Sequence, residues 1–183
     1  MKNLLFVFIA LILFSCTDMK KTEQISAINK MFTSLDSIET VLFNNEIDTI
    51  AALNLAAMGV ELRIKNNYYS DTIDMELGKK MDAYKLARRA LSPLGRSYSV
   101  IKKGVKDERI VLRRLKDDIE RGNGERKKHT EYVKFEEAKT NQLRSLLNGY
   151  LAEKDKNMKT FFSLYEELNA FSLELLEKRK KTN

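Results

Sequence analysis

Residues 84–119 read YKLARRALSPLGRSYSVIKKGVKDERIVLRRLKDDI and carry the most regular apolar pattern in the chain. Apolar side chains recur at alternating spacings of three and four, as they do along the seam of a coiled coil. The seam positions are Tyr84, Ala87, Leu91, Leu94, Tyr98, Ile101, Val105, Glu108, Leu112, Leu115 and Ile119. Only Glu108 breaks the apolar rule. The spacing predicts a long helix that packs along its length against other helices.

Pro93 lies inside this segment, yet the apolar phase does not slip across it. A proline removes a backbone donor, so it either kinks a helix or begins a new one, here with Ser92 as the cap. The unbroken phase favours a kink in one helix over residues 73–121. Gly122-Asn123-Gly124 predicts its end. The residues expected to cap its start are Ser70, Asp71 or Thr72.

Two further segments show the helical period. Residues 21–68 carry an apolar stripe that includes Ile28, Leu35 and Leu42 and resumes after Asn45 with Ala57, Val60 and Ile64, so we expect one long helix with a kink near Asn45. Residues 125–180 contain no proline and form the third predicted helix. Its expected core positions are Tyr132, Phe135, Ala138, Leu143, Leu146, Tyr150, Met158, Phe161, Leu164, Leu168, Phe171 and Leu175.

These segments predict an all-α fold. Three long helices with short connections favour an elongated, antiparallel, coiled-coil bundle, which resembles spectrin-type repeats in architecture only. Residues 22–181 would form this single helical domain, with kinks near Asn45 and Pro93. The alternative is that the breaks near Asn45 and Ser92 are true turns, which would give a shorter five-helix bundle.

The first sixteen residues differ in character from the rest of the chain. Lys2 is followed by eleven apolar residues from Leu4 to Phe14, and the chain turns polar after Cys16. A charged start, a short apolar centre and a small residue before a cleavage point are typical of a secretion signal. The apolar run is too short to span a hydrocarbon core of roughly 30 Å. We therefore predict a signal peptide at residues 1–15.

Leu13-Phe14-Ser15-Cys16 resembles the lipobox of bacterial lipoproteins. The resemblance implies cleavage before Cys16, attachment of diacylglycerol to its thiol and a fatty acid such as palmitate on its amino group. Residues 16–21 would then be a lipidated tether. Thr17, rather than an aspartate, after the cysteine implies the outer membrane of a Gram-negative cell. The resemblance leaves surface display open, and we take the periplasmic face as the default.

Charge is unevenly distributed along the chain. Residues 79–134 hold most of the excess of basic side chains, whereas residues 20–78 are net acidic. The two segments can face each other as neighbouring helices. A basic patch of Arg121, Arg126, Lys127 and Lys128 around the glycine turn is expected to lie near the lipid anchor and its anionic headgroups.

Motifs for catalysis are missing from the sequence. His129 is the only histidine and Cys16 the only cysteine, so no nucleophile–base pair and no histidine- or cysteine-based metal site can be assembled. We predict a solvated His129, a solvated Glu136-Glu137 pair, no cofactor and no enzymatic activity. Glu108 is interpreted as a polar residue that sets register or pairs with a basic side chain of another helix.

The predicted function is a non-catalytic structural, binding or scaffolding role in the cell envelope. Tyr68 and Tyr69, beside the first turn, form a candidate contact patch. Expected partners are membrane lipid through Cys16, an envelope protein or anionic envelope polymer, or a second copy of the chain. The export signal argues against nucleic acid. The rival interpretation is a small-ligand carrier or enzyme with a pocket at the helix kinks.

Overall fold

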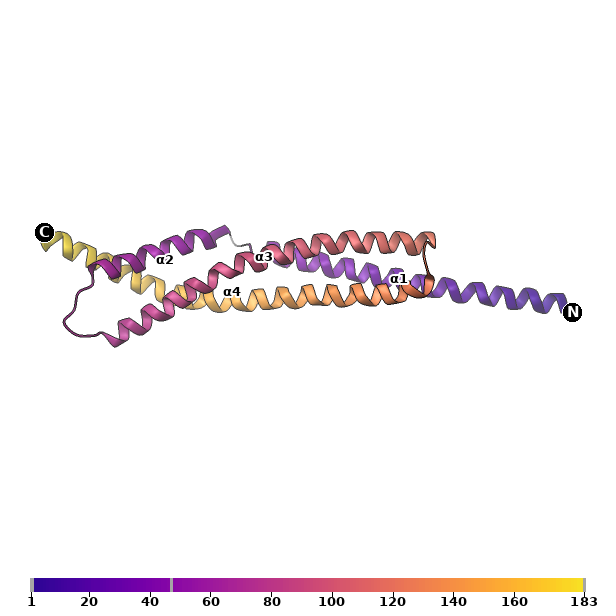
Figure 1. The fold of residues 1–183 in the computed structure, drawn as a ribbon, viewed down its shortest axis with the longest axis horizontal. Helices are drawn as coiled ribbons and strands as arrows, with labels where there is room; N and C mark the ends of the chain where they lie inside the picture. Colours follow the sequence, from indigo (N-terminus) through magenta and orange to yellow (C-terminus); the bar gives the residue numbers. More distant parts are fainter. Residues whose placement is uncertain (1, 47, 183) are drawn as a thin grey trace. The chain divides into compact units, whose positions relative to one another are not determined.

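In the computed structural model, the described residues of the chain form four α-helices (Figure 1). They are α1 (Lys2–Phe43), α2 (Asp48–Asn67), α3 (Met75–Arg121) and α4 (Arg126–Thr182). The structure describes the backbone of residues 2–46 and 48–182 and the side chains of residues 19–46 and 50–181. The all-α prediction is confirmed. The signal peptide, Cys16 and the rest of the lipobox lie outside the residues whose side chains are described.

The prediction of three helices is wrong in one place. Residues 44–46 form a turn between α1 and α2, so the first predicted helix is two helices. The turn is held from α4, because the Tyr150 hydroxyl donates to the backbone oxygen of Asn45 at 2.7 Å. Lys154 Nζ also donates to the side-chain oxygen of Asn45 at 3.2 Å. Two adjacent asparagines disfavour a helix, and their polar groups find partners in the turn.

Pro93 lies within the continuous helix α3, as the unbroken phase predicted. Its side chain is exposed, so the ring meets solvent rather than a neighbouring helix. The cap at the start of α3 was placed too early in the sequence. Asp74 is the capping residue, because its Oδ1 accepts from the backbone N–H groups of Glu76 and Leu77 at 3.1 and 2.9 Å.

The helices contribute to two compact units. Unit 1 comprises Met1–Phe43 and Ile101–Ser145, and unit 2 comprises Asn44–Val100 and Leu146–Asn183. Each unit therefore contains three helical segments, with α3 and α4 contributing one segment to each. The prediction of a single domain over residues 22–181 stays a prediction.

Unit 1 joins α1, the second half of α3 and the first half of α4, which run side by side in Figure 1. Polar contacts define the direction of each helix. Lys21 and Asn29 on α1 contact Glu120 and Lys116 on α3, so these helices are antiparallel. Gln24 and Ser34 contact Thr130 and Arg144 on α4, so α1 and α4 are parallel.

Unit 2 repeats this arrangement with α2 in the first position. Glu61 on α2 binds Arg88 on α3, while Arg63 binds Asn169 and Ser172 on α4. Its core is aromatic: Tyr84 of α3 stacks on Phe161 of α4 with ring centroids 5.2 Å apart. Both side chains are fully buried.

Candidate binding groove

Helix α2 carries two apolar faces. Ala57, Val60 and Ile64 are buried and form the face that packs into unit 2. A second apolar stripe consists of Leu55, Met58 and Leu62, whose side chains are 72%, 54% and 58% exposed. The stripe residues are spaced by three and four, so they lie on one side of the helix. One apolar face of α2 is thus buried within unit 2, and the other is exposed to solvent.

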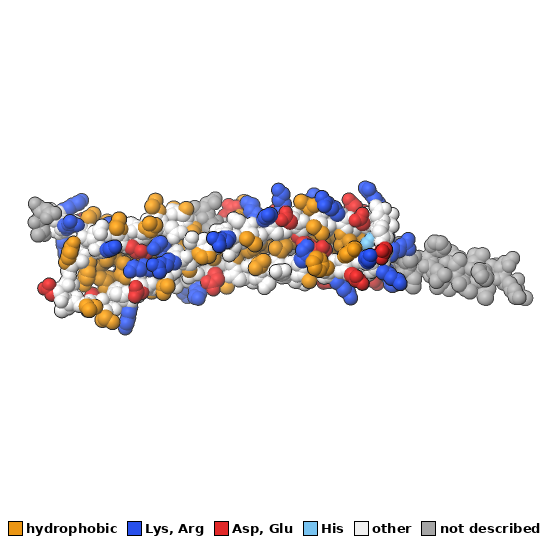
Figure 2. Space-filling view, in the orientation of Figure 1, with side chains coloured by type: hydrophobic (Ala, Val, Ile, Leu, Met, Phe, Trp, Pro, Cys, Tyr) orange, Lys and Arg blue, Asp and Glu red, His pale blue; other side chains and the backbone are white. Residues whose placement is uncertain are grey.

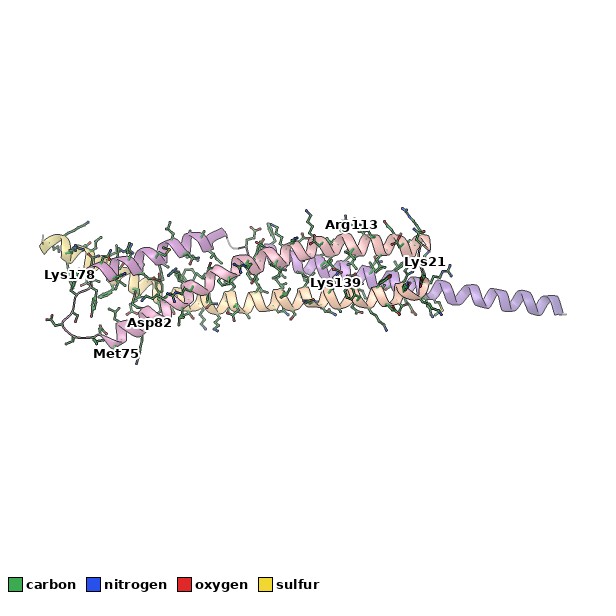
Figure 3. All side chains as sticks on the ribbon, in the orientation of Figure 1. Lys21, Met75, Asp82, Arg113, Lys139 and Lys178 are labelled. Carbon is green, nitrogen blue, oxygen red and sulfur yellow. The ribbon has the colours of Figure 1, made fainter. Side chains whose placement is uncertain are left out.

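The open face of α2 borders a groove with a volume of about 790 Å³ against the first half of α3. This volume lies within the usual range of roughly 300–1,000 Å³ for ligand sites. Figure 2 shows hydrophobic side chains gathered over this part of unit 2. Met75 and Asp82, labelled in Figure 3, mark the beginning of α3. The lining residues are Leu55, Met58, Gly59, Glu61, Leu62, Ile64, Lys65, Met81, Lys85 and Arg88.

Charged residues form the rim of the groove. Arg88 is paired across it with Glu61, through Nε at 2.7 Å and Nη2 at 3.3 Å. Lys65 and Lys85 add two further positive charges. Asp82 approaches Lys85 Nζ only to 4.0 Å, and no ion pair of Lys65 is found among the residues that the structure describes. The rim is net basic, because its one carboxylate is already used by Arg88.

The walls of the groove are held by the rest of unit 2. Arg63 fastens α2 to α4, because its Nε and Nη2 donate to Ser172 Oγ at 2.9 Å and Asn169 Oδ1 at 2.6 Å. In the core behind the groove, burial raises the pKa of the Tyr84 hydroxyl, which has no hydrogen-bond partner in the described part of the chain. The α2 wall is thus tied to α4, and the Glu61–Arg88 pair ties it to α3.

A second cluster of chemically active side chains lies in unit 1. Lys139 Nζ on α4 bridges Glu136 Oε2 at 2.7 Å and Glu108 Oε2 at 3.2 Å (Figure 3 places Lys139). Glu108 is only 4% exposed, and burial and the neighbouring Glu136 raise its pKa to about 7. A carboxyl group with this pKa can exchange protons near neutrality. Glu108 does not line any cavity described for unit 1, so we interpret the cluster as structural.

The interpretation of Glu108 as a partner for a basic side chain on another helix is confirmed by its ion pair with Lys139. The expectation that Glu136 is solvated is wrong, because Glu136 is buried on the seam of α4. Its neighbour Glu137 is exposed as expected. The α4 seam runs through Val133, Glu136 and Thr140 at spacings of three and four, one position beyond the expected core residues Tyr132 and Phe135.

The predicted basic patch lies at the turn between α3 and α4. Arg121, Arg126, Lys127 and Lys128 are all exposed. The expectation that His129 is solvated is wrong, because its side chain is only 5% exposed. His129 lies four residues before Val133 and is therefore on the seam of α4, which places its ring inside unit 1.

The two tyrosines of the predicted contact patch have different surroundings. Tyr69 is 83% exposed. Tyr68 is half-buried, and its ring centroid lies 6.0 Å from that of Phe171 on α4. Neither residue lines the groove of unit 2. Only Tyr69 therefore remains as an open contact.

Sequence reasoning missed the groove residues Leu55, Met58 and Leu62. The helical period assigned Ala57, Val60 and Ile64 to the core correctly, and the remaining apolar residues were left without a role. The available signal was an excess of apolar side chains, because residues 50–64 contain more of them than one helix face can bury.

Other site chemistry is limited in the described part of the chain. No group of three or more His, Cys, Asp or Glu side chains is placed to hold a metal ion there. Over the same residues, none of the helices has an apolar stretch long enough to cross a membrane. In comparisons with protein-family models, curated proteins and solved structures, nothing matches this chain.

Proposed function

We propose that the protein is a lipid-anchored lipoprotein of the cell envelope with a non-catalytic binding or scaffolding role. The observation that carries the proposal is the open groove of unit 2, whose lining is mostly apolar and whose rim is basic. A concave apolar surface with few polar groups is the usual form of a binding site. The alternative, a small-ligand carrier or enzyme with a pocket at the helix kinks, has less support, because the groove is lined by neither Asn45 nor Pro93.

The anchor in this proposal is Cys16. Two or more acyl chains hold a protein stably at a membrane, whereas one chain alone is marginal. Thr17 after the cysteine supports the outer membrane of a Gram-negative cell, with the protein facing the periplasm. A single cysteine directly after the apolar run is the observation in favour of lipid attachment.

Contacts in unit 1 support a membrane-facing role for the basic patch. Lys21 Nζ donates to the backbone oxygen of Glu120 at 2.8 Å, and Gln24 contacts Thr130 at 2.9 Å. The start of the described part of α1 therefore lies beside the turn that carries Arg121 and Arg126. Cys16 is only five residues before Lys21 along the chain. Each cation near an anionic surface contributes about 1 kcal/mol to membrane binding.

Metabolic labelling tests the anchor. Cells that express the full chain are given an alkyne fatty acid, and the protein is then coupled to a fluorophore. We expect label on the wild-type chain in the membrane fraction and none on Cys16→Ser. Equal labelling of both chains, or a wild-type chain without label in the soluble fraction, would overturn the proposal.

The basic patch is tested separately with a full chain that carries Cys16→Ser. Charge reversal at Arg126, Lys127 and Lys128 is expected to weaken binding to anionic vesicles, and the loss should shrink as salt is added. Reversal of the exposed Lys156, Lys159 and Lys181 of α4 serves as the control. Unchanged vesicle binding after the first reversal would contradict a membrane role for the patch.

The proposal includes an elongated arrangement of the helices. Helices of the length of α3 and α4, at about 1.5 Å per residue, favour an elongated antiparallel bundle of roughly 70–90 Å. Small-angle scattering on the purified chain tests this dimension. A compact particle of roughly 50 Å would contradict it.

A further inference from the structure

We propose that the groove of unit 2 binds the apolar face of an amphipathic helix whose flanks carry acidic side chains. The inference rests on the proposed binding role and names the partner of that site. It follows from the spacing of the lining residues and from the charge of the rim.

Both edges of the groove have the spacing that a packed helix requires. On α2 the edge is formed by Leu55, Met58, Leu62 and Lys65, at intervals of three, four and three. On α3 it is formed by Met81, Lys85 and Arg88, at intervals of four and three. Side chains at these intervals form one row along each helix, and a helix laid between two such rows inserts its own apolar residues into both.

The lining supplies the apolar contact that such a helix needs. Leu55, Met58 and Leu62 are more than half exposed, although they are large aliphatic side chains. Met58 adds a flexible side chain that adapts to the shape of a partner. Lys85 and Arg88 contribute their aliphatic stems to the wall and keep their charges at the rim. An apolar helix face read at intervals of three and four is the matching ligand.

Charge selects an acidic partner. Glu61 is neutralised by Arg88, which leaves Lys65 on one edge and, on the other, Lys85, whose contact with the exposed Asp82 is long at 4.0 Å. A helix in the groove would have one flank near each lysine. Glutamate or aspartate on these flanks gains two ion pairs at the border of an apolar contact, whereas lysine or arginine there is repelled.

The same charges disfavour a second copy of this chain as the occupant. The exposed stripe of α2 is followed one turn later by Lys65, and the facing wall of α3 carries Lys85. If the stripe of one copy entered the groove of another, basic residues would meet basic residues. The groove therefore fits a different, acidic chain better than it fits itself.

Peptide binding to the purified full-length chain tests the inference. The probe is a synthetic three-heptad peptide with leucine at the seam positions, glutamate on both flanks and a fluorescent label, and the matched probe carries lysine on the flanks. We expect fluorescence anisotropy to show binding of the acidic peptide at least about tenfold tighter than that of the basic peptide. Equal binding of the two peptides, or binding of neither, would overturn the inference.

Variants locate the binding. Met58→Glu and Leu62→Glu are expected to weaken binding of the acidic peptide by at least about tenfold. Leu173→Glu is the matched control, because Leu173 is a similarly exposed leucine of α4 that does not line the groove. Lys65→Glu combined with Lys85→Glu should reverse the preference to the basic peptide. All these side chains are on the surface, so we expect each variant to fold. Circular dichroism and the urea midpoint of each variant check this expectation.

Two other occupants are outcomes of the same experiment. Light scattering would reveal a dimer, and a dimer that Leu62→Glu dissociates would replace the acidic helix by a second copy. Loss of binding to phosphatidylglycerol vesicles in Leu62→Glu but not in Leu173→Glu would replace it by a membrane surface. Either result overturns the inference. Loss of fatty-acid labelling at Cys16 would overturn the anchor proposal alone, because peptide binding does not depend on the lipid.

Discussion

Unit 1 and unit 2 contain the same number of helical segments but hold them together differently. The core of unit 1 includes Glu108, Glu136 and Thr140, and its helices are joined by ion pairs such as Arg109 with Asp36 and Glu39. Unit 2 also has ion pairs, such as Glu61 with Arg88, but its core contains stacked rings, with Tyr84, Phe161 and Tyr165 in contact. Buried charged groups restrict which neighbouring side chains are acceptable, because an unpaired buried charge is strongly destabilising, whereas aromatic rings stabilise a core through the large apolar area that they bury.

The two units also differ in what they leave open. The α1 segment of unit 1 buries Ile28, Leu35 and Ile38 and presents polar side chains outward. The α2 segment of unit 2 buries one apolar face and exposes another. The outer face of α1 is thus polar, whereas α2 exposes an apolar surface that a partner can bury.

The largest expected effect is in the aromatic core. Phe161→Ala removes a fully buried ring that contacts Tyr84 and Tyr165, so it should lower the free energy of unfolding by about 3–5 kcal/mol. Urea denaturation measures the loss, and hydrogen exchange should place it in unit 2. Phe135→Ala is the control in unit 1, because that ring is mostly exposed. A similar loss for both variants would remove the contrast between the cores.

The next effect concerns the charged core of unit 1. Lys139→Met leaves Glu108 and Glu136 without their shared cation, which we expect to cost about 2 kcal/mol of folding stability, less than for a fully buried pair because Lys139 is partly exposed. Glu108→Gln in the same chain should recover part of this loss, because it removes one of the two carboxylates. Urea midpoints of the two single variants and the double variant measure the coupling. Strictly additive losses would show that the three groups do not act together.

The pH dependence of folding stability tests the burial of Glu108 in unit 1 by a second measurement. The pKa of Glu108 is raised to about 7 in the fold from 4.5, so between these values the folded chain holds a proton that the unfolded chain has lost. Folding stability should therefore fall by about 3 kcal/mol as the pH rises through this window. Unfolding measured at both ends of the window should show this slope in the wild-type chain and a flatter one in Glu108→Gln. An identical slope in both chains would assign the effect to other groups.

The smallest expected effect is a difference in folding stability between alanine substitutions at two glycines of α3. A methyl group added at Gly95 in unit 2 would meet no neighbouring atom within 4 Å, so Gly95→Ala should raise the free energy of unfolding by about 0.5–1 kcal/mol through helix propensity. Gly104 in unit 1 differs, because a methyl group there would lie 2.6 Å from Leu143 Cδ2. Gly104→Ala should therefore not raise the free energy of unfolding, because the close contact with Leu143 offsets the gain in helix propensity. Equal shifts of the thermal midpoint in the two variants would mean that Leu143 moves aside at no cost.

The sequence predicted α3 well because one strong apolar seam leaves little choice of face. Ten of its eleven predicted positions are buried, and Tyr98 is half-buried. The first half of α4 was predicted less well, because Tyr132 and Phe135 are more apolar than Glu136 and Thr140 and were therefore assigned to the core. Glu136 pairs with Lys139 of the same helix, and Lys139 also pairs with Glu108 of α3. That link between two helices cannot be derived from a pattern within one segment.

The break after α1 was predicted at the right place but as a kink. Its outcome depends on Tyr150, which lies more than a hundred residues away and binds the backbone of Asn45. The groove was missed for a related reason. Periodicity identifies an apolar face but does not show whether a neighbour covers it, so the exposed stripe on α2 was visible only once the helices were placed.

The glycine turn between α3 and α4 has a consequence for the order of folding. Gly122 and Gly124 both adopt positive φ, of 70° and 82°, so the reversal of the chain is completed within a few residues. The α3–α4 contacts of unit 1, such as Glu108 with Lys139, then close a short loop, whereas Lys80 and Glu167 in unit 2 are 87 positions apart. Short loops lose less chain entropy on closure. Among the contacts between α3 and α4, we expect those of unit 1 to form first during refolding, and the aromatic contacts between the same two helices in unit 2 to form afterwards.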